Sequence, residues 1–239
     1  MSGEERTIWV YLTASPLLHL TLTVVAYAGA DWLYRRSGRK ALFNPVLIAV
    51  IVLVTLLTTT GIPYSRYFEG AQFVHFLLGP ATVALAVPLF RQFHLIRRSW
   101  LAIAVAVLFG SSMAVVSAVG LGWVMGASRE ALISLAPKSV TTPVAMGIAE
   151  KLGGLPSLTA VLVILTGILG AVLGSALLRL VRIRDPRAVG LAIGVASHGI
   201  GTARALQLGE LTGAFAAMAM GLNALATAVL VPLLFRLLG

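Results

Sequence analysis

The chain has 239 residues, of which 59% are hydrophobic and 11% are charged, and its mean hydropathy is +0.97. A soluble domain carries about a quarter charged residues, so this composition excludes an ordinary soluble globular protein. The formal charge of +10 would suggest nucleic-acid binding in a soluble protein. Most Lys and Arg residues, however, lie in short clusters between apolar runs, where they orient a membrane protein, and we expect no nucleic-acid partner.

Long uncharged stretches define the fold class. Residues 101–128, 152–178 and 211–235 contain no Asp, Glu, Lys or Arg, and each exceeds the roughly 20 residues that a helix needs to cross the hydrocarbon core. They do not show the alternation of barrel strands. We therefore predict an all-α integral membrane protein that forms a single domain over 1–239.

Six membrane spans are expected, and basic clusters follow the first, third and fifth. Placing these clusters in the cytoplasm of a bacterium puts the N-terminus outside the inner membrane. The first six residues lack the basic region of a cleavable signal, so we expect the first span to remain in the protein. The spans cover about 15–34, 44–64, 73–89, 100–127, 158–178 and 211–235.

The segment 131–151 is unlike a plain span, because it contains two prolines, two lysines, two serines and two threonines. If it crossed the membrane once, the basic cluster after the next span would lie outside. A re-entrant hairpin keeps that cluster in the cytoplasm, in agreement with the positive-inside rule. We therefore divide the chain into four spans (1–130), a hairpin plus a span (131–182) and a second copy (186–239).

The second copy begins with 190–210, which is also polar and rich in glycine at its centre. A hairpin plus one span is an odd number of crossings, so the two copies should be inverted, an arrangement found in secondary transporters. The similarity of 78–83 to 135–140 suggests that the third span is interrupted as well. The alternative is that both polar segments cross fully as broken helices, which gives eight crossings.

Lys138 is the sharpest feature of the first polar segment. A charge at that depth costs at least about 2.5–3.5 kcal/mol, so it normally lies in a cavity or beside a partner. The adjacent Pro137 breaks the helix and frees N–H groups that favour an anion. We expect Lys138, Ser139, Thr141 and Thr142 to bind substrate. The alternative is that Lys138 reaches the interface from a shallow loop.

The second polar segment supplies a matching set of candidates. Gly199 and Gly201 permit an unwound backbone, His198 could carry a proton, and the guanidinium of Arg204 suits a carboxylate. Thr202 completes the set, and a packing histidine remains the alternative for His198. Three secondary candidates lie in other spans: Pro80, Thr82 and Asn223, the last two of which are ordinarily explained by hydrogen bonding between helices.

Other chemistries find little support in the sequence. Cysteine is absent, and the histidines lack metal-ligand spacing, so we expect neither a metal nor a cofactor. No nucleophile elbow, zinc-protease motif or nucleotide-binding loop is present, so we do not expect an enzyme.

At the polar motifs the chain closely resembles the LrgB/CidB family. The stretches that carry the resemblance are LLGPATVALAVPLF (77–90), LAPKSVTTPVAM (135–146) and GLAIGVASHGIGTARAL (190–206). The resemblance implies two competing functions. Bacterial members are described as holin/antiholin-like proteins that modulate murein hydrolase export and lysis, whereas plastid relatives look like glycolate/glycerate carriers.

We expect a secondary transporter of small monocarboxylates, coupled to protons, and keep the holin/antiholin-like function as the alternative. The resemblance also implies a small LrgA/CidA-type membrane subunit, and we expect a homo- or hetero-oligomer. The substrate stays open among glycolate, glycerate, pyruvate, lactate and acetate.

Overall fold

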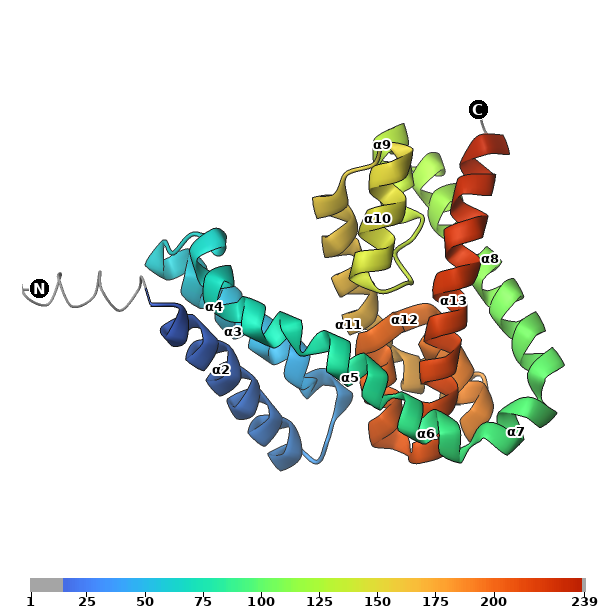
Figure 1. Ribbon diagram of the computed structural model, residues 1–239, viewed down its shortest axis with the longest axis horizontal. Coiled ribbons are helices and arrows are strands. Elements are labelled where there is room, and N and C mark those ends of the chain that lie inside the picture. The colour runs from blue at the N-terminus through green and yellow to red at the C-terminus, as the bar shows by residue number, and fades with distance from the viewer. Residues whose placement is uncertain (1–14, 238–239) are drawn as a thin grey trace, which may run out of the picture. The chain divides into compact units, whose positions relative to one another are not determined.

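The computed structural model describes residues 15–237, with only the backbone at residues 41, 75, 78, 79 and 82. Within this part of the chain every regular element is a helix, as the composition predicts. The residues fall into two compact units, unit 1 (Met1–Ala84) and unit 2 (Leu85–Gly239). The helices of unit 1 are α2 (Pro16–Arg36), η1 (Ala41–Phe43), α3 (Pro45–Thr60), α4 (Tyr64–Phe76) and α5 (Leu78–Ala84) (Figure 1).

In unit 1, α2 packs against α3 and α4. Asn44 caps α3, because its side-chain oxygen accepts hydrogen bonds from the N–H groups of Val46 and Leu47 at 2.9 and 3.2 Å. The buried imidazole of His19 meets the ring of Tyr67 edge to face, with 6.0 Å between their centroids. The contact between His19 and Tyr67 joins α2 to α4.

The expected spans of the first half of the chain are only partly seen as long apolar helices. The predicted span at 73–89 is divided among the end of α4, α5 and α6, as the repeated motif at 78–83 suggests. Among the described residues, three helices are long and apolar enough to cross a membrane, and all three lie in unit 2. They are α8, α11 and α13, while α3 is a shorter apolar helix, and the six-span arrangement stays a prediction.

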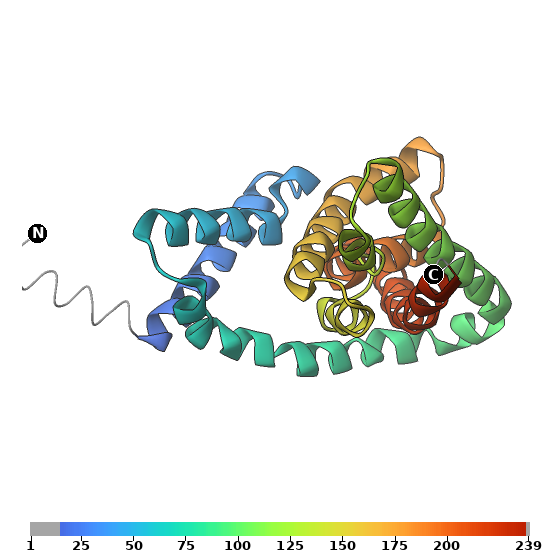
Figure 2. The same ribbon diagram turned by 90° about the horizontal axis from the view of Figure 1, so that it is seen from above.

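Unit 2 is built around the long helix α13. The helices lie in the order α11, α12, α13 and α8, and Figure 2 shows α8 and α11 on either side of the pair formed by α12 and α13. The helices of unit 2 are α6 (Ala86–Arg91), α7 (Phe93–Arg98), α8 (Trp100–Val124), α9 (Arg129–Leu135), α10 (Thr142–Leu152), α11 (Pro156–Leu180), α12 (Pro186–Leu208) and α13 (Glu210–Leu237).

The long helices differ in direction. The first half of α8 packs on the first half of α13 and the second half on the second, so these two helices run parallel. The first half of α12 runs parallel to α13. The glycines of α11 meet that half of α12 in reverse order. Helix α11 is therefore antiparallel to α13. The pairs on α11 and α12 are Gly167 with His198, Gly170 with Ser197 and Gly174 with Ile193.

The first polar segment folds as a hairpin made of α9, a loop at 136–141 and α10. The hydroxyl of Ser134, at the end of α9, accepts a hydrogen bond from the N–H of Leu155 at 2.8 Å. Ile133 and Ile148 share one apolar cluster. The chain therefore reverses direction in the loop and returns to the start of α11.

The second polar segment, α12, also reverses direction. His198 has φ 41° and ψ −138°, which breaks the helix. Gly190 lies against Thr212, and Leu206 lies against Gly213, so both ends of α12 are beside the start of α13. In a straight helix these two positions of α12 would be about 24 Å apart.

Each reversal is thus followed by a long helix, and the two long helices are antiparallel. The first hairpin is joined to the start of α11, at one end of unit 2, and the second to the start of α13, at the other end. The end where α8 begins and α11 finishes is the basic end of unit 2. Its arginines are Arg91, Arg97, Arg98, Arg179, Arg182, Arg184 and Arg187.

Candidate functional site at the crossing of the two broken segments

The two broken segments meet at Asn223 of α13. The side-chain nitrogen of Asn223 donates one hydrogen bond to the carbonyl of Ser139, in the loop of the first hairpin, at 3.1 Å. It donates a second to the carbonyl of Val195, in the last turn of α12 before the break, at 2.9 Å. One amide group therefore joins segments that are far apart in the sequence.

The oxygen of the same amide is also fully used. It accepts hydrogen bonds from the hydroxyls of Ser111 on α8, at 2.6 Å, and Thr227 on α13, at 3.3 Å. An asparagine side chain can make four such bonds, so its capacity is filled although the residue is only 1% exposed. Ser111 and Asn223 both lie near the middle of long apolar helices, so this polar crossing lies about midway along α8 and α13.

His198 lies at the break of α12 and is buried. Its Nε2 atom is 2.8 Å from the carbonyl oxygen of Val163 on α11. Because a carbonyl only accepts, Nε2 must carry a proton, and Nδ1 is the nitrogen that can gain one. The hydroxyl of Thr202 donates to the carbonyl of His198 at 2.8 Å, which satisfies a backbone group beside the break.

Lys138 lies at the turn of the first hairpin. Its side chain is half-buried, and Nζ donates to the hydroxyl of Ser139 at 3.4 Å. The charges of Lys138 and His198 are close enough to interact. The structure thus brings together two ionisable residues that the sequence analysis singled out in the two polar segments.

The first turn of α10 begins at Thr142, four residues after Lys138. Thr141 occupies the N-cap position in extended conformation, but its side chain makes no capping hydrogen bond. Thr142 is the first helical residue and is half-buried. These hydroxyls and the N–H groups of the first turn of α10 are donors of the kind that an anion requires.

The remaining candidates on α12 lie beyond the break. Gly199 is exposed, with open space where a side chain would project. Gly201 is buried, and a side chain there would collide with Ser197, so close packing explains this glycine. Nη1 of Arg204 donates to the side chain of Gln207 at 3.1 Å in an exposed position.

The secondary candidates have different outcomes. Pro80 is exposed on α5 of unit 1, and the side chain of Thr82 lies outside the described residues. Asn223 bonds both broken segments, whereas the sequence analysis made it only a secondary candidate and explained it by hydrogen bonding between helices. Val163 contributes through its backbone carbonyl, and its side-chain type carries no signal that could have identified it.

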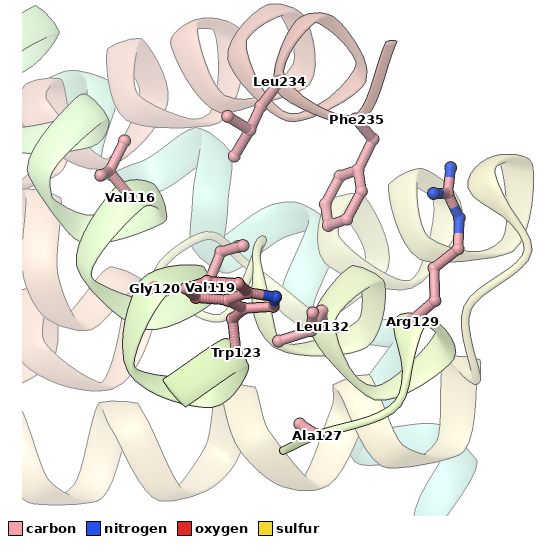
Figure 3. Close-up of a pocket in the computed structure, with 9 residues that line it drawn as sticks. All are labelled: Val116, Val119, Gly120, Trp123, Ala127, Arg129, Leu132, Leu234 and Phe235. Atoms are coloured by element: carbon pink, nitrogen blue, oxygen red, sulfur yellow. The ribbon is translucent and has the colours of Figure 1, made fainter. Parts of the chain in front are cut away.

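Two pockets of about 560 and 690 Å³ open on the surface of α8 and α13, and apolar side chains form most of their walls. Figure 3 shows the smaller one, where Trp123 of α8 and Phe235 of α13 face a gap with Arg129 at its edge. Neither pocket is lined by Lys138 or His198. Within residues 15–237, no group of His, Asp and Glu side chains is arranged to hold a metal ion.

Comparison with known proteins gives a consistent family. Residues 23–237 match the LrgB-like family. The uncharacterized protein YxaC of Bacillus subtilis (strain 168) is 40% identical over 87% of this chain and 90% of its own. The antiholin-like protein LrgB of Bacillus mycoides (strain KBAB4) is 30% identical over 95% of this chain and 99% of its own. No solved structure matches.

Proposed function

Because this chain belongs to the LrgB-like family of membrane proteins, and its two broken segments meet inside unit 2, we propose that it is a transporter of small monocarboxylates. The observation that carries the proposal is the crossing itself, where Lys138 and His198 come together at mid-depth of the long helices. Secondary transporters bind their substrates at such crossings of inverted, broken helices.

In the proposed arrangement α8, α11 and α13 cross the bilayer of the bacterial inner membrane, and the two hairpins are re-entrant. The basic end of unit 2 faces the cytoplasm, in accordance with the positive-inside rule. The N-terminus then lies outside after three crossings by the first part of the chain. In the hydrocarbon, polar backbone at the hairpin turns is tolerated because it is enclosed by protein.

The chemistry of the crossing suits a carboxylate. Lys138 supplies the positive charge, while Ser139, Thr141 and Thr142 supply hydroxyl donors. Such donors also suit the oxygen on the second carbon of glycolate, glycerate or pyruvate. His198 holds its Nε2 proton against Val163, so Nδ1 is free to take a transported proton. We propose proton coupling on this basis.

A holin/antiholin-like function is the second candidate, and the names of the Bacillus relatives favour it more directly than they favour transport. In this function the protein would modulate murein hydrolase export together with an LrgA/CidA-type subunit. An oligomer would form, and the apolar grooves on α8 and α13 would be available for subunit contacts. The geometry of the crossing would then serve packing only.

Reconstitution in liposomes distinguishes the two functions. Saturable uptake of radiolabelled glycolate and pyruvate is measured with the chain alone and with an LrgA-type partner. We expect Lys138→Ala to reduce uptake at least tenfold, whereas Lys151→Ala, which removes an exposed lysine at the end of α10, leaves it unchanged. His198→Ala should remove the pH dependence of uptake.

The opposite result is equally clear. If the liposomes release a trapped dye without selectivity, and Lys138→Ala behaves like Lys151→Ala, then the carrier proposal is wrong. If a variant lacks transport but still modulates lysis, then the effect on lysis does not depend on transport.

A further inference from the structure

We propose that Asn223 is a positioning residue for transport: its amide holds the two broken segments in register and thereby sets the distance between Lys138 and His198. This inference rests on the proposed function, because one of its tests measures transport. It goes beyond that function because Asn223 itself touches no substrate in this assignment.

The bonding of Asn223 is directional. Its two N–H groups are both directed to backbone carbonyls of broken segments, and its oxygen receives hydroxyls from the unbroken helices α8 and α13. Ser111 and Thr227 could be replaced by apolar side chains without separating the two breaks. The amide nitrogen could not, because it is the group that bonds both of them.

The two carbonyls need these donors. Val195 lies in the last turn of α12 before His198, where carbonyls lose their partners within the helix. Ser139 lies in the loop between α9 and α10, outside regular structure. A buried carbonyl without a partner is unfavourable, so each segment is more stable beside Asn223 than away from it.

The two hydrogen bonds from Asn223 to these carbonyls, here called ties, also limit the distance between the two broken segments. Both carbonyl oxygens lie about 3 Å from one nitrogen atom, so they are no more than about 6 Å apart. Lys138 directly precedes Ser139, and His198 follows Val195 by less than one helical turn. Holding the carbonyls together therefore limits the separation of the backbone at Lys138 and His198, the residues that we assign to the anion and the proton.

The test compares Asn223→Asp with Ser111→Ala. The first variant keeps the size of the side chain and its acceptor, but it loses both N–H donors and presents oxygen to two carbonyls. The second removes one strong buried hydrogen bond from the same amide and leaves both ties to the breaks intact. A purely structural defect would lower the amount of active protein, and hence the maximal rate, without changing the half-saturation concentration.

We expect Asn223→Asp to raise the half-saturation concentration for uptake at least tenfold, and Ser111→Ala to leave it within twofold of the wild-type value. If Asn223→Asp does not fold, Asn223→Gln replaces it, since the longer arm cannot keep both ties at their present lengths. A half-saturation concentration within twofold of wild type in the Asn223 variant would overturn the inference.

A labelling experiment tests the same tie without transport. The chain has no native cysteine, so Gly199→Cys is a single reporter at the second break, where a side chain fits in open space. We expect Asn223→Asp to increase its rate of reaction with a maleimide several-fold, while Gly147→Cys on α10, also in open space, is unaffected. If wild type shows no saturable uptake, the proposed function fails, and an unchanged labelling rate at position 199 would separately refute the role of Asn223.

Discussion

The break in α12 leads us to predict that glycine at position 198 gives a more stable protein than alanine. His198 has φ 41° and ψ −138°, a conformation that costs a residue with a side chain about 1–3 kcal/mol and costs glycine little. His198→Ala and His198→Gly both lose the imidazole and its bond to Val163, so that loss cancels between them. We therefore expect His198→Gly to be more stable than His198→Ala by about 1–2 kcal/mol.

At an ordinary helical position the order is reversed. Ala196 is exposed in the first half of the same helix, and Ala196→Gly should reduce stability by about 0.5–1 kcal/mol. The measurement is the free energy of unfolding of the purified variants in mixed detergent micelles, with Ala196→Gly as the matched control. If His198→Ala is as stable as His198→Gly, the backbone at position 198 is not strained, and the argument that this residue fixes the break is refuted.

Three further predictions concern packing and capping in unit 2. Gly194→Val should prevent correct packing, since even a methyl group at this position would collide with the backbone of α13; we expect a loss of at least about 3 kcal/mol in the same unfolding assay. Ser134→Ala leaves the N–H of Leu155 without its partner and should cost about 1–3 kcal/mol. Asp185→Ala removes the cap of α12 and should cost about 1 kcal/mol at pH 7. Arg187 lowers the pKa of Asp185 from 3.8 to about 2, so this stabilisation is present above pH 3.8 and disappears as the pH falls through about 2, where variant and wild type should unfold alike.

Much of unit 2 could be predicted from the sequence because its signals are local. Uncharged runs longer than a bilayer crossing become α8, α11 and α13. Pro137 and Lys138 identify the first reversal, and Gly199 and Gly201 directly follow the second. Composition cannot show that a histidine, instead of one of these glycines, takes the positive φ. Contacts across the fold, rather than local preference, hold that conformation.

The predictions for the first part of the chain were less accurate for a physical reason. The apolar stretch 73–89 is long enough for a span, but its hydropathy does not indicate where a helix ends. The structure divides this stretch among α4, α5 and α6. Pro80 and Pro88 each lack a backbone donor, and here they lie within the first turns of short helices, where that donor is not required.

The candidate site was predicted in part because charges in an apolar run are conspicuous. Lys138 and His198 were singled out by the energetic cost of burying them, whereas Asn223 resembled any polar residue that bonds between helices. Its importance lies in which two carbonyls it meets, and pairings of that kind depend on tertiary structure. The role of the Val163 carbonyl could not be predicted from the sequence for the same reason.

In the proposed carrier, the difference between the two breaks has a consequence for coupling. Lys138 contributes an ammonium group, and His198 contributes an imidazole, the side chain whose ordinary pKa lies closest to neutral pH. A carboxylate bound at Lys138 offsets the repulsion between that cation and a protonated His198, so anion binding and proton binding favour each other. Such coupling is reciprocal by thermodynamic necessity. Two permanent cations at the crossing would bind the anion without any dependence on the proton, and two histidines would leave the empty site without a fixed charge to attract it. One lysine and one histidine, held together by Asn223, therefore suit symport of a proton with an anion.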